Sequence, residues 1–420
     1  MGAPDRDRLV RRSTALLAAT QAFLWAGAGI FATFGALSVH ALFGGAASVG
    51  FLIAVFWVSA GAGAPLAGRV MDRLGRRPGL AAGHLLIAAS GVAAAVSVGS
   101  GSGAGLLLSA IPMGLGAGAA LLARVAVADM YPPERRARAI GLMVAAGTIG
   151  AVGGPFLASW IHGLAEGRGV AEPLAAPWML LPVFGAAALL AVLLLRPDPR
   201  ELAISGPSRV ARPSAGRVLR LRPGIVAAAA IGASQPVMTT FMGLSPVVLS
   251  DHGAGAGAIS AVVSGHLAGM LAFSPAIGVV LDRWGRRRGL LVGLGITAGG
   301  VLLTALPTAT LVVGLGLFVV GLGWSVAYLG STSVVTDLTQ PAERAGALGL
   351  IDLVTALSSA VGVLGGAALL QATSFPTLAV VALVLLMVPA LLLLPLREPA
   401  PGRWDTGAAV GQAAPDRGVA

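Results

Sequence analysis

Long apolar stretches recur along the chain, and the short segments between them carry most of the charge. Each stretch holds about 20 residues, which as an α-helix matches the hydrocarbon thickness of a bilayer. The pattern predicts an all-α integral membrane protein with twelve transmembrane helices. The predicted spans are 15–39, 48–69, 78–99, 104–128, 139–161, 178–195, 224–248, 258–280, 289–306, 309–334, 346–370 and 376–395.

The composition agrees with a membrane protein and excludes several other classes. Hydrophobic residues make up 56% of the chain and charged residues 11%, whereas soluble domains carry about 25% charged residues. The chain has no Cys, so disulfides and thiolate metal sites are excluded. It also has no Lys, which a nucleotide-binding P-loop requires. We therefore expect no enzyme activity, no cofactor and no bound metal.

The net charge of +11 comes from Arg placed at the ends of the spans. If the N-terminus is cytoplasmic, 27 of the 28 Arg residues lie in cytoplasmic segments and Arg168 alone lies outside. Cytoplasmic loops of membrane proteins carry such an excess of Arg. The bias predicts a multi-pass protein of the inner (plasma) membrane with both termini cytoplasmic. The positive charge therefore indicates contact with the lipid bilayer and not with a nucleic acid.

The order of the spans predicts two six-helix halves. The first half covers residues 1–195 and the second covers 224–396. Residues 196–223 are polar, Arg-rich and contain five prolines, as expected for a cytoplasmic linker. Residues 397–420 are predicted to form a disordered cytoplasmic tail.

The two halves repeat one another in sequence. Residues 65–80 read PLAGRVMDRLGRRPGL, and residues 275–290 read PAIGVVLDRWGRRRGL. A second pair of matching segments begins at Asp129 and at Asp337. Internal repeats are common in secondary transporters, so the duplication predicts two pseudo-symmetric bundles.

The repeated segment resembles the loop after the second helix in the major facilitator superfamily, whose pattern is G-x-x-x-D-R-x-G-R-R. The matching residues are Gly68, Asp72, Arg73, Gly75, Arg76 and Arg77 in the first half and Gly278, Asp282, Arg283, Gly285, Arg286 and Arg287 in the second. The resemblance covers essentially the whole chain, and the segment from His266 is similar to a poorly characterised bacterial branch. It implies the fold of that superfamily, transport by alternating access and a monomer.

The glycines of the repeated segment have two expected roles. Gly75 and Gly285 allow a tight turn, because glycine adopts positive φ angles without steric cost. Gly68 and Gly278 are expected to let a neighbouring helix approach closely.

The charged residues of the repeated segment are expected to form a cytoplasmic latch. Asp72 and Asp282 are expected to accept hydrogen bonds from the start of a facing helix. The Arg residues can reach Asp129 and Asp337 across the same surface. The resemblance implies that these contacts close the cytoplasmic side in the outward-facing state. The alternative is that the Arg residues only enforce topology.

The predicted fifth helix contains a glycine motif, Gly150, Gly153, Gly154 and Pro155. Closely spaced glycines form a groove for a neighbouring helix, and a proline bends a helix. The motif resembles the antiporter signature of drug/proton exchangers in the superfamily. Simple helix packing is the alternative, because the usual glycine pair after the proline is missing and Ala110 replaces an expected Arg.

Three ionisable residues within the spans are candidates for proton coupling, because charges inside membranes are costly. Asp352 lies about two turns into the eleventh span, where it either titrates or pairs with a basic residue. Arg124 in the fourth span is such a partner, although it can also extend to the cytoplasm. His266 in the eighth span is the third candidate.

Four further residues are candidates for the substrate cavity between the halves. Gln21 and Trp25 are four residues apart on the first span and share one face. Gln235 lies in the seventh span and Trp324 in the tenth. With almost no charge nearby, such a cavity suits an uncharged or weakly amphipathic compound. The alternative is that the Trp residues serve packing.

These observations predict a secondary active transporter that moves a small, largely apolar compound across the membrane. Proton-coupled export, which is efflux by an antiporter, is the leading hypothesis. Uptake or facilitated diffusion of a small metabolite is the first alternative. A membrane scaffold or sensor without transport activity is the second. The expected partners are therefore a small-molecule substrate and the proton.

Overall fold

The computed structural model describes residues 3–204, 218–305, 309–339, 344–396 and 398. The predicted tail, apart from Glu398, and the centre of the predicted linker lie outside the described residues. Within these ranges the chain forms helices and no strand. Eleven helices are long and apolar enough to cross a membrane, and the bent pair α11–α12 makes a twelfth span. The prediction of an all-α membrane protein with twelve spans is confirmed.

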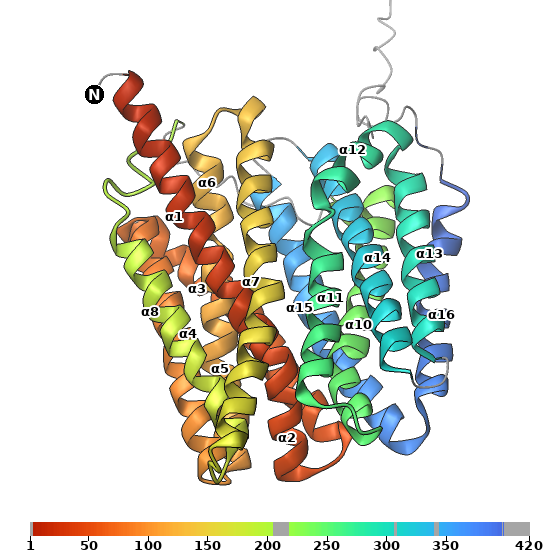
Figure 1. The fold of residues 1–420 in the computed structure, drawn as a ribbon. Helices are drawn as coiled ribbons and strands as arrows, with labels where there is room; N and C mark the ends of the chain where they lie inside the picture. Colours follow the sequence, from red (N-terminus) through yellow and green to blue (C-terminus); the bar gives the residue numbers. More distant parts are fainter. Residues whose placement is uncertain (1–2, 205–217, 306–308, 340–343, 397, 399–420) are drawn as a thin grey trace, which may run out of the picture.

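The two halves are two helical bundles that stand side by side (Figure 1). The first half contains α1 (Ala3–Ile30), the π-helix η1 (Phe31–Gly35), α2 (Ala36–Phe43), α3 (Ala46–Leu74), α4 (Arg76–Gly99), α5 (Gly103–Ala120), α6 (Ala123–Met130), α7 (Pro133–Gly167), the 3-10 helix η2 (Pro173–Met179) and α8 (Leu180–Leu193). The second half contains α10 (Arg222–Asp251), α11 (Ala256–Leu271), α12 (Ser274–Trp284), α13 (Arg286–Ala305), α14 (Thr310–Asp337), α15 (Arg344–Ala372) and α16 (Phe375–Leu393).

Two spans that the sequence predicted as continuous are broken. The fourth span consists of α5 and α6, separated by a turn at Leu121 and Leu122. The eighth span consists of α11 and α12, which meet at an angle of 40°. Pro275 lies in the first turn of α12, where it has no amide hydrogen to donate to a carbonyl at the end of α11.

The repeated segments form two equivalent turns at one end of the molecule. Gly75 joins α3 to α4 with a φ of 101°, and Gly285 joins α12 to α13 with a φ of 91°. Only glycine adopts this backbone geometry easily. We call this the Arg-rich end; it is uppermost in Figure 1, near the labels α6 and α12, and α1 begins there.

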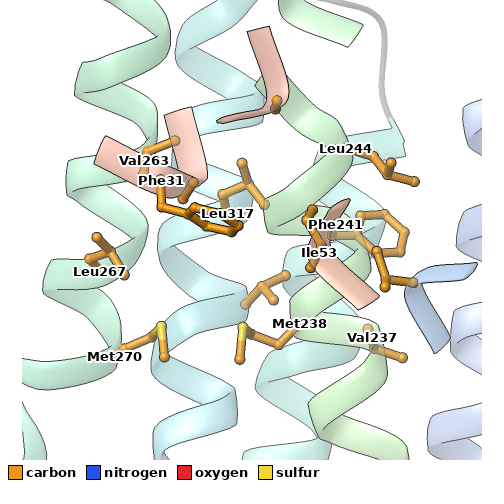
Figure 2. Packing of buried hydrophobic residues seen from close by; sticks show 14 of the residues in the cluster. Phe31, Ile53, Val237, Met238, Phe241, Leu244, Val263, Leu267, Met270 and Leu317 are labelled. Carbon is orange, nitrogen blue, oxygen red and sulfur yellow. The ribbon is translucent and has the colours of Figure 1, made fainter. Parts of the chain in front are cut away.

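At the opposite end the two halves pack tightly against each other. Helix α3 lies against α15, and α7 lies against α11. A Cβ atom on Gly50 would overlap Ala367 of the other half. Figure 2 shows Phe31 and Ile53 of the first half among apolar residues of α10, α11 and α14. A continuous apolar core therefore closes the interface at this end.

The outer faces of the bundles expose apolar side chains of the kind expected to face lipid. On α16 the residues Val380, Val384, Met387 and Leu391 are spaced three or four apart and are 51–60% exposed. This spacing places them on one face of the helix. A soluble protein rarely exposes so continuous an apolar stripe, so the face fits a bilayer.

The glycine motif of α7 provides close packing against α1. A Cβ atom on Gly150 would overlap the carbonyl oxygen of Ala22, and one on Gly154 would lie 2.5 Å from that of Ala26. By contrast, nothing lies within 4 Å of a Cβ atom on Gly153. Two of the three glycines therefore serve helix packing within the first half.

Pro155 does not interrupt this helix. Helix α7 continues from Pro133 to Gly167 with Pro155 inside it. The proline ring lies against α1, where a Cβ atom on Gly29 would come within 2.7 Å of its Cγ atom. Pro155 thus extends the same packing surface.

The Arg-rich end is expected to face the cytoplasm, and introduced cysteines test this directly because the chain has none. Glu201 at the Arg-rich end and Ala171 in the loop before η2 are both exposed. A membrane-impermeant maleimide should label Ala171→Cys in intact cells, and Glu201→Cys only after permeabilisation. Labelling of both variants in intact cells would contradict the twelve-span topology.

The glycines of α7 provide a matched test of packing. Gly150→Val should lower thermal stability in detergent, because overpacking a tight contact costs about 1–3 kcal/mol. Gly153→Val is the control, since its position is open, and should unfold close to the wild-type temperature. Equal losses of stability in the two variants would show that the α1–α7 contact is not the cause.

Candidate transport site

An Arg–Asp network surrounds the turn between α3 and α4. The guanidinium of Arg76 donates to Asp129 at the end of α6 through Nε (3.1 Å) and Nη2 (2.8 Å). Its Nη1 donates to Asp72 one turn earlier (3.4 Å). One Arg thus joins the second, third and fourth spans at the Arg-rich end.

The second half repeats this network. Arg286 donates to Asp337 at the end of α14 (3.3 Å) and to Asp282 one turn earlier (2.6 Å). Both networks lie within their own halves. Arg73 and Arg283, two further charged members of the repeated segments, are exposed.

Two carboxylates that the sequence analysis missed cap the helices after these turns. Asp198, just after the sixth span, accepts from the backbone amides of Arg76 (3.1 Å) and Arg77 (2.9 Å). Glu398, after the twelfth span, accepts from those of Arg286 (2.8 Å) and Arg287 (3.1 Å). A carboxylate is favourable at a helix N-terminus, where amides lack partners. The sequence signal that could have identified these caps is the acidic residue that follows span six and its counterpart after span twelve.

The capping carboxylates correct the role expected of Asp72 and Asp282. These two side chains are 65% and 70% exposed and pair with an Arg side chain one turn away. The amides at the starts of α4 and α13 bond instead to the acidic residues after spans six and twelve.

The expectation for Gly68 and Gly278 is wrong in this structure. Nothing lies within 4 Å of a Cβ atom at either glycine. Both positions lie near the Arg-rich end and are partly exposed. No helix therefore requires a glycine there in this conformation.

An ion pair joins the two halves between their ends. Arg124 of α6 donates through Nη2 to Asp352 of α15 (2.6 Å) and through Nη1 to the hydroxyl of Tyr328 on α14 (3.3 Å). The Tyr328 hydroxyl donates to the other oxygen of Asp352 (3.3 Å). The Arg124 and Asp352 side chains are 38% and 40% exposed, so the pair is accessible.

The broken fourth span positions Arg124. At the turn, the backbone amide of Arg124 donates to the carbonyl of Leu121 (3.4 Å). In a continuous α-helix this amide would donate to the carbonyl of Ala120, which is therefore left without its helical partner. The side chain of Gln21 on α1 donates to that carbonyl instead (3.1 Å). Gln21 is 3% exposed. It therefore stabilises the break and does not lie with the other cavity candidates.

A second polar cluster lies deeper in the second half, next to the ion pair. The indole nitrogen of Trp324 donates to the Gln235 carbonyl oxygen (2.6 Å). The Gln235 amide donates to Ser359 (2.9 Å). The Trp324 ring stacks on Tyr328, with centroids 5.1 Å apart and planes at 19°. The structure thus joins two cavity candidates to the coupling candidate Asp352 through Tyr328.

The remaining candidates lie elsewhere. Trp25 is partly exposed and packs against Gly147 of α7. His266 is fully buried within the second half, where its Nδ1 atom donates to the carbonyl of Leu317 (2.7 Å). Its Nε2 atom is buried and has no hydrogen-bond partner among the described residues. The structure does not bring His266 to the ion pair.

Curated relatives include two bacterial transporters of similar length. The chain is 29% identical over 409 residues to the uncharacterised MFS-type transporter YdeG of Bacillus subtilis, covering 93% of each chain. It is 28% identical over 356 residues to the riboflavin transporter RfnT of Brucella anthropi, covering 82% of this chain and 85% of that protein.

Solved transporter structures share the fold. The nucleoside transporter NupG superposes with a TM-score of 0.69 over 91% of this chain and 98% of that one, at 16% identity. The family model of the Major Facilitator Superfamily matches residues 16–249 and 230–413. Together with the two six-helix bundles and their repeated Arg–Asp networks, this match shows that the chain belongs to the Major Facilitator Superfamily.

Proposed function

We propose that this transporter exports a small, largely apolar compound in exchange for protons. Membership of the superfamily supports membrane transport by alternating access. The observation that carries the proton coupling is the ion pair between Arg124 and Asp352, because it links the two halves and one partner can be neutralised by a proton.

The position of the pair makes it sensitive to alternating access. Asp352 lies eight residues into α15, about 12 Å from the start of that helix at the Arg-rich end. The apolar contacts at the opposite end close the interface there. Opening the Arg-rich end moves α6 away from α15, so it must separate Arg124 from Asp352.

Protonation of Asp352 lowers the cost of this separation. A neutral carboxyl interacts only weakly with Arg124, whereas an ionised one forms a charge-assisted hydrogen bond. A proton that binds Asp352 therefore favours opening at the Arg-rich end, and its release there restores the pair. If this binding and release occurs once per cycle, protons move toward the Arg-rich end. Their movement supplies the energy for substrate transport in the opposite direction.

The two Arg–Asp networks act as latches in this proposal. Arg76 binds the end of α6, the helix that carries Arg124. Its network therefore sets the position of the ion pair relative to α3 and α4. Loss of Asp72 or Asp129 would leave the Arg side chain with one partner and loosen the Arg-rich end.

Uptake of a planar metabolite is the second candidate function. It is favoured by the similarity to RfnT, which is named as a riboflavin transporter. The two candidates differ in the direction of substrate movement relative to protons. Substrate added outside proteoliposomes should acidify the lumen under symport and make it alkaline under exchange, whereas measurable flux without a pH change supports facilitated diffusion. A scaffold would give no flux.

The ion pair yields the main prediction. Asp352→Asn mimics the protonated carboxyl, so pH-driven transport should fall by at least about tenfold, which is ~1.4 kcal/mol, while substrate exchange at equal pH continues. Both rates are measured in proteoliposomes at matched protein density. Unchanged dependence on the pH gradient would eliminate Asp352 as the coupling residue.

A double variant separates coupling from a structural role. If the pair serves only stability, Asp352→Asn should reduce abundance, because it leaves Arg124 without its counterion, and adding Arg124→Gln should restore it. If the pair couples protons, the double variant should regain abundance and remain insensitive to the pH gradient. Recovery of pH-driven transport in the double variant would refute the proposal.

The latch gives a separate prediction. Asp72 is largely exposed, so Asp72→Asn should insert and accumulate normally. Flux should nevertheless fall by roughly tenfold if the charge is needed for gating. Arg168→Gln at the opposite end is the control for a lost charge and should keep normal flux. Normal flux in well-inserted Asp72→Asn would assign the segment to topology alone.

A further inference from the structure

The hydrogen bonds of Gln235 leave none of its amide groups free. Its carbonyl oxygen accepts from the Trp324 indole at 2.6 Å, and its nitrogen donates to Ser359 at 2.9 Å and to Thr239 at 3.2 Å. Both amide hydrogens and the oxygen are therefore engaged. Gln235 is also completely buried. It cannot contact a substrate directly, unlike a polar residue that lines a cavity.

The partners of Gln235 fix the orientation of its amide. The Ser359 hydroxyl donates to the carbonyl of Thr355 (2.8 Å), so it accepts from Gln235. The Thr239 hydroxyl lies 3.2 Å from that of Ser359. The carbonyl oxygen of Gln235 consequently points to Trp324. A fixed acceptor of this kind holds the indole in one orientation.

The indole held in this way stacks on a second aromatic ring. Trp324 and Tyr328 lie one turn apart on α14, and their rings stack nearly parallel. Both residues are partly exposed, and the only hydrogen-bond donor of the indole is occupied by Gln235. The accessible part of the Trp324 ring is therefore apolar, because its one polar group is engaged.

We propose that Trp324 and Tyr328 form the surface on which the substrate stacks, and that Gln235 is the positioning residue that holds Trp324. This inference rests on the proposed transport function and names its substrate class as planar, conjugated ring compounds with little charge. Flat ring systems gain from parallel contact with an indole beyond the area that they bury. A flexible polyol gains little from such a face.

The stacking surface is also connected to the ion pair. The Tyr328 hydroxyl bonds to Asp352, and Arg124 donates to that hydroxyl. A substrate stacked on the two rings thus contacts Tyr328, whose hydroxyl is hydrogen-bonded to Asp352. Tyr328→Phe should keep the stacking surface and weaken the link between substrate binding and protonation.

Binding to the purified full-length protein tests the substrate class without any proton gradient. The probes are indole, lumichrome and riboflavin as planar ring systems, and ribitol as the non-planar control. We expect at least one planar probe to bind with an affinity that falls roughly tenfold in Trp324→Leu and only severalfold in Trp324→Phe, which keeps an aromatic ring but loses the bond to Gln235. Absence of binding by every planar probe, or unchanged affinity in Trp324→Leu, would overturn the proposal.

A double-variant cycle tests the positioning role of Gln235. Gln235→Met removes the acceptor at similar volume and should weaken planar-probe binding severalfold when Trp324 is present. In the Trp324→Phe background, which has no indole N–H, the same change should have no further effect. An equal loss in both backgrounds would show a general packing defect and overturn the assignment. Ser359→Ala serves as a milder second variant if Gln235→Met unfolds.

The outcomes distinguish this inference from the proposed function. Planar-probe binding that depends on Trp324, combined with transport insensitive to pH, would refute proton coupling and leave the stacking surface intact. Proton-coupled transport of a compound that competes with no planar probe would refute the stacking surface and leave the coupling intact.

Discussion

The contact between Arg124 and Asp352 is the interaction around which the rest of the structure is arranged. Each half supplies one charge, and neither charge has another ionised partner in the hydrogen bonds and ion pairs found among the described residues. A charge within a membrane protein is costly unless it is compensated. Meeting at this point therefore stabilises both charges, and in the proposed cycle the relative motion of the two halves breaks the contact.

Several features of the fold hold these two charges in place. The break at Leu121 and Leu122 turns Arg124 toward the other half, and Gln21 satisfies the carbonyl that the break exposes. Arg76 binds Asp129 at the end of the same short helix. On the other side, Tyr328 links Asp352 to the stacked indole of Trp324. The latch, the ion pair and the aromatic surface thus form one connected series of contacts from the Arg-rich end inward.

The two halves are equivalent at the Arg-rich end and differ in the middle. Asp198 and Glu398 cap equivalent helices, and Arg76 and Arg286 bind equivalent carboxylates. These contacts stabilise each bundle internally, so duplication preserves them. The ion pair and the aromatic stack do not follow this symmetry, because Arg124 and Asp352 come from different halves and Trp324 and Tyr328 both come from α14.

The sequence by itself determined the span number, the two halves and the Arg-rich turns, because these follow from helix length, charge placement and a repeat along the chain. It also identified Asp352 as a costly residue and offered Arg124 as its partner. Only the tertiary structure decided that they meet, since the two lie 228 positions apart on different halves. It likewise removed Gln21 from the cavity candidates and turned Gln235 inward, because the carbonyl that binds Gln21 and the Ser359 and Trp324 side chains that bind Gln235 come from other helices. The periodicity of one helix shows which residues share a face, but the partner of a buried polar group depends on which other helix lies against that face.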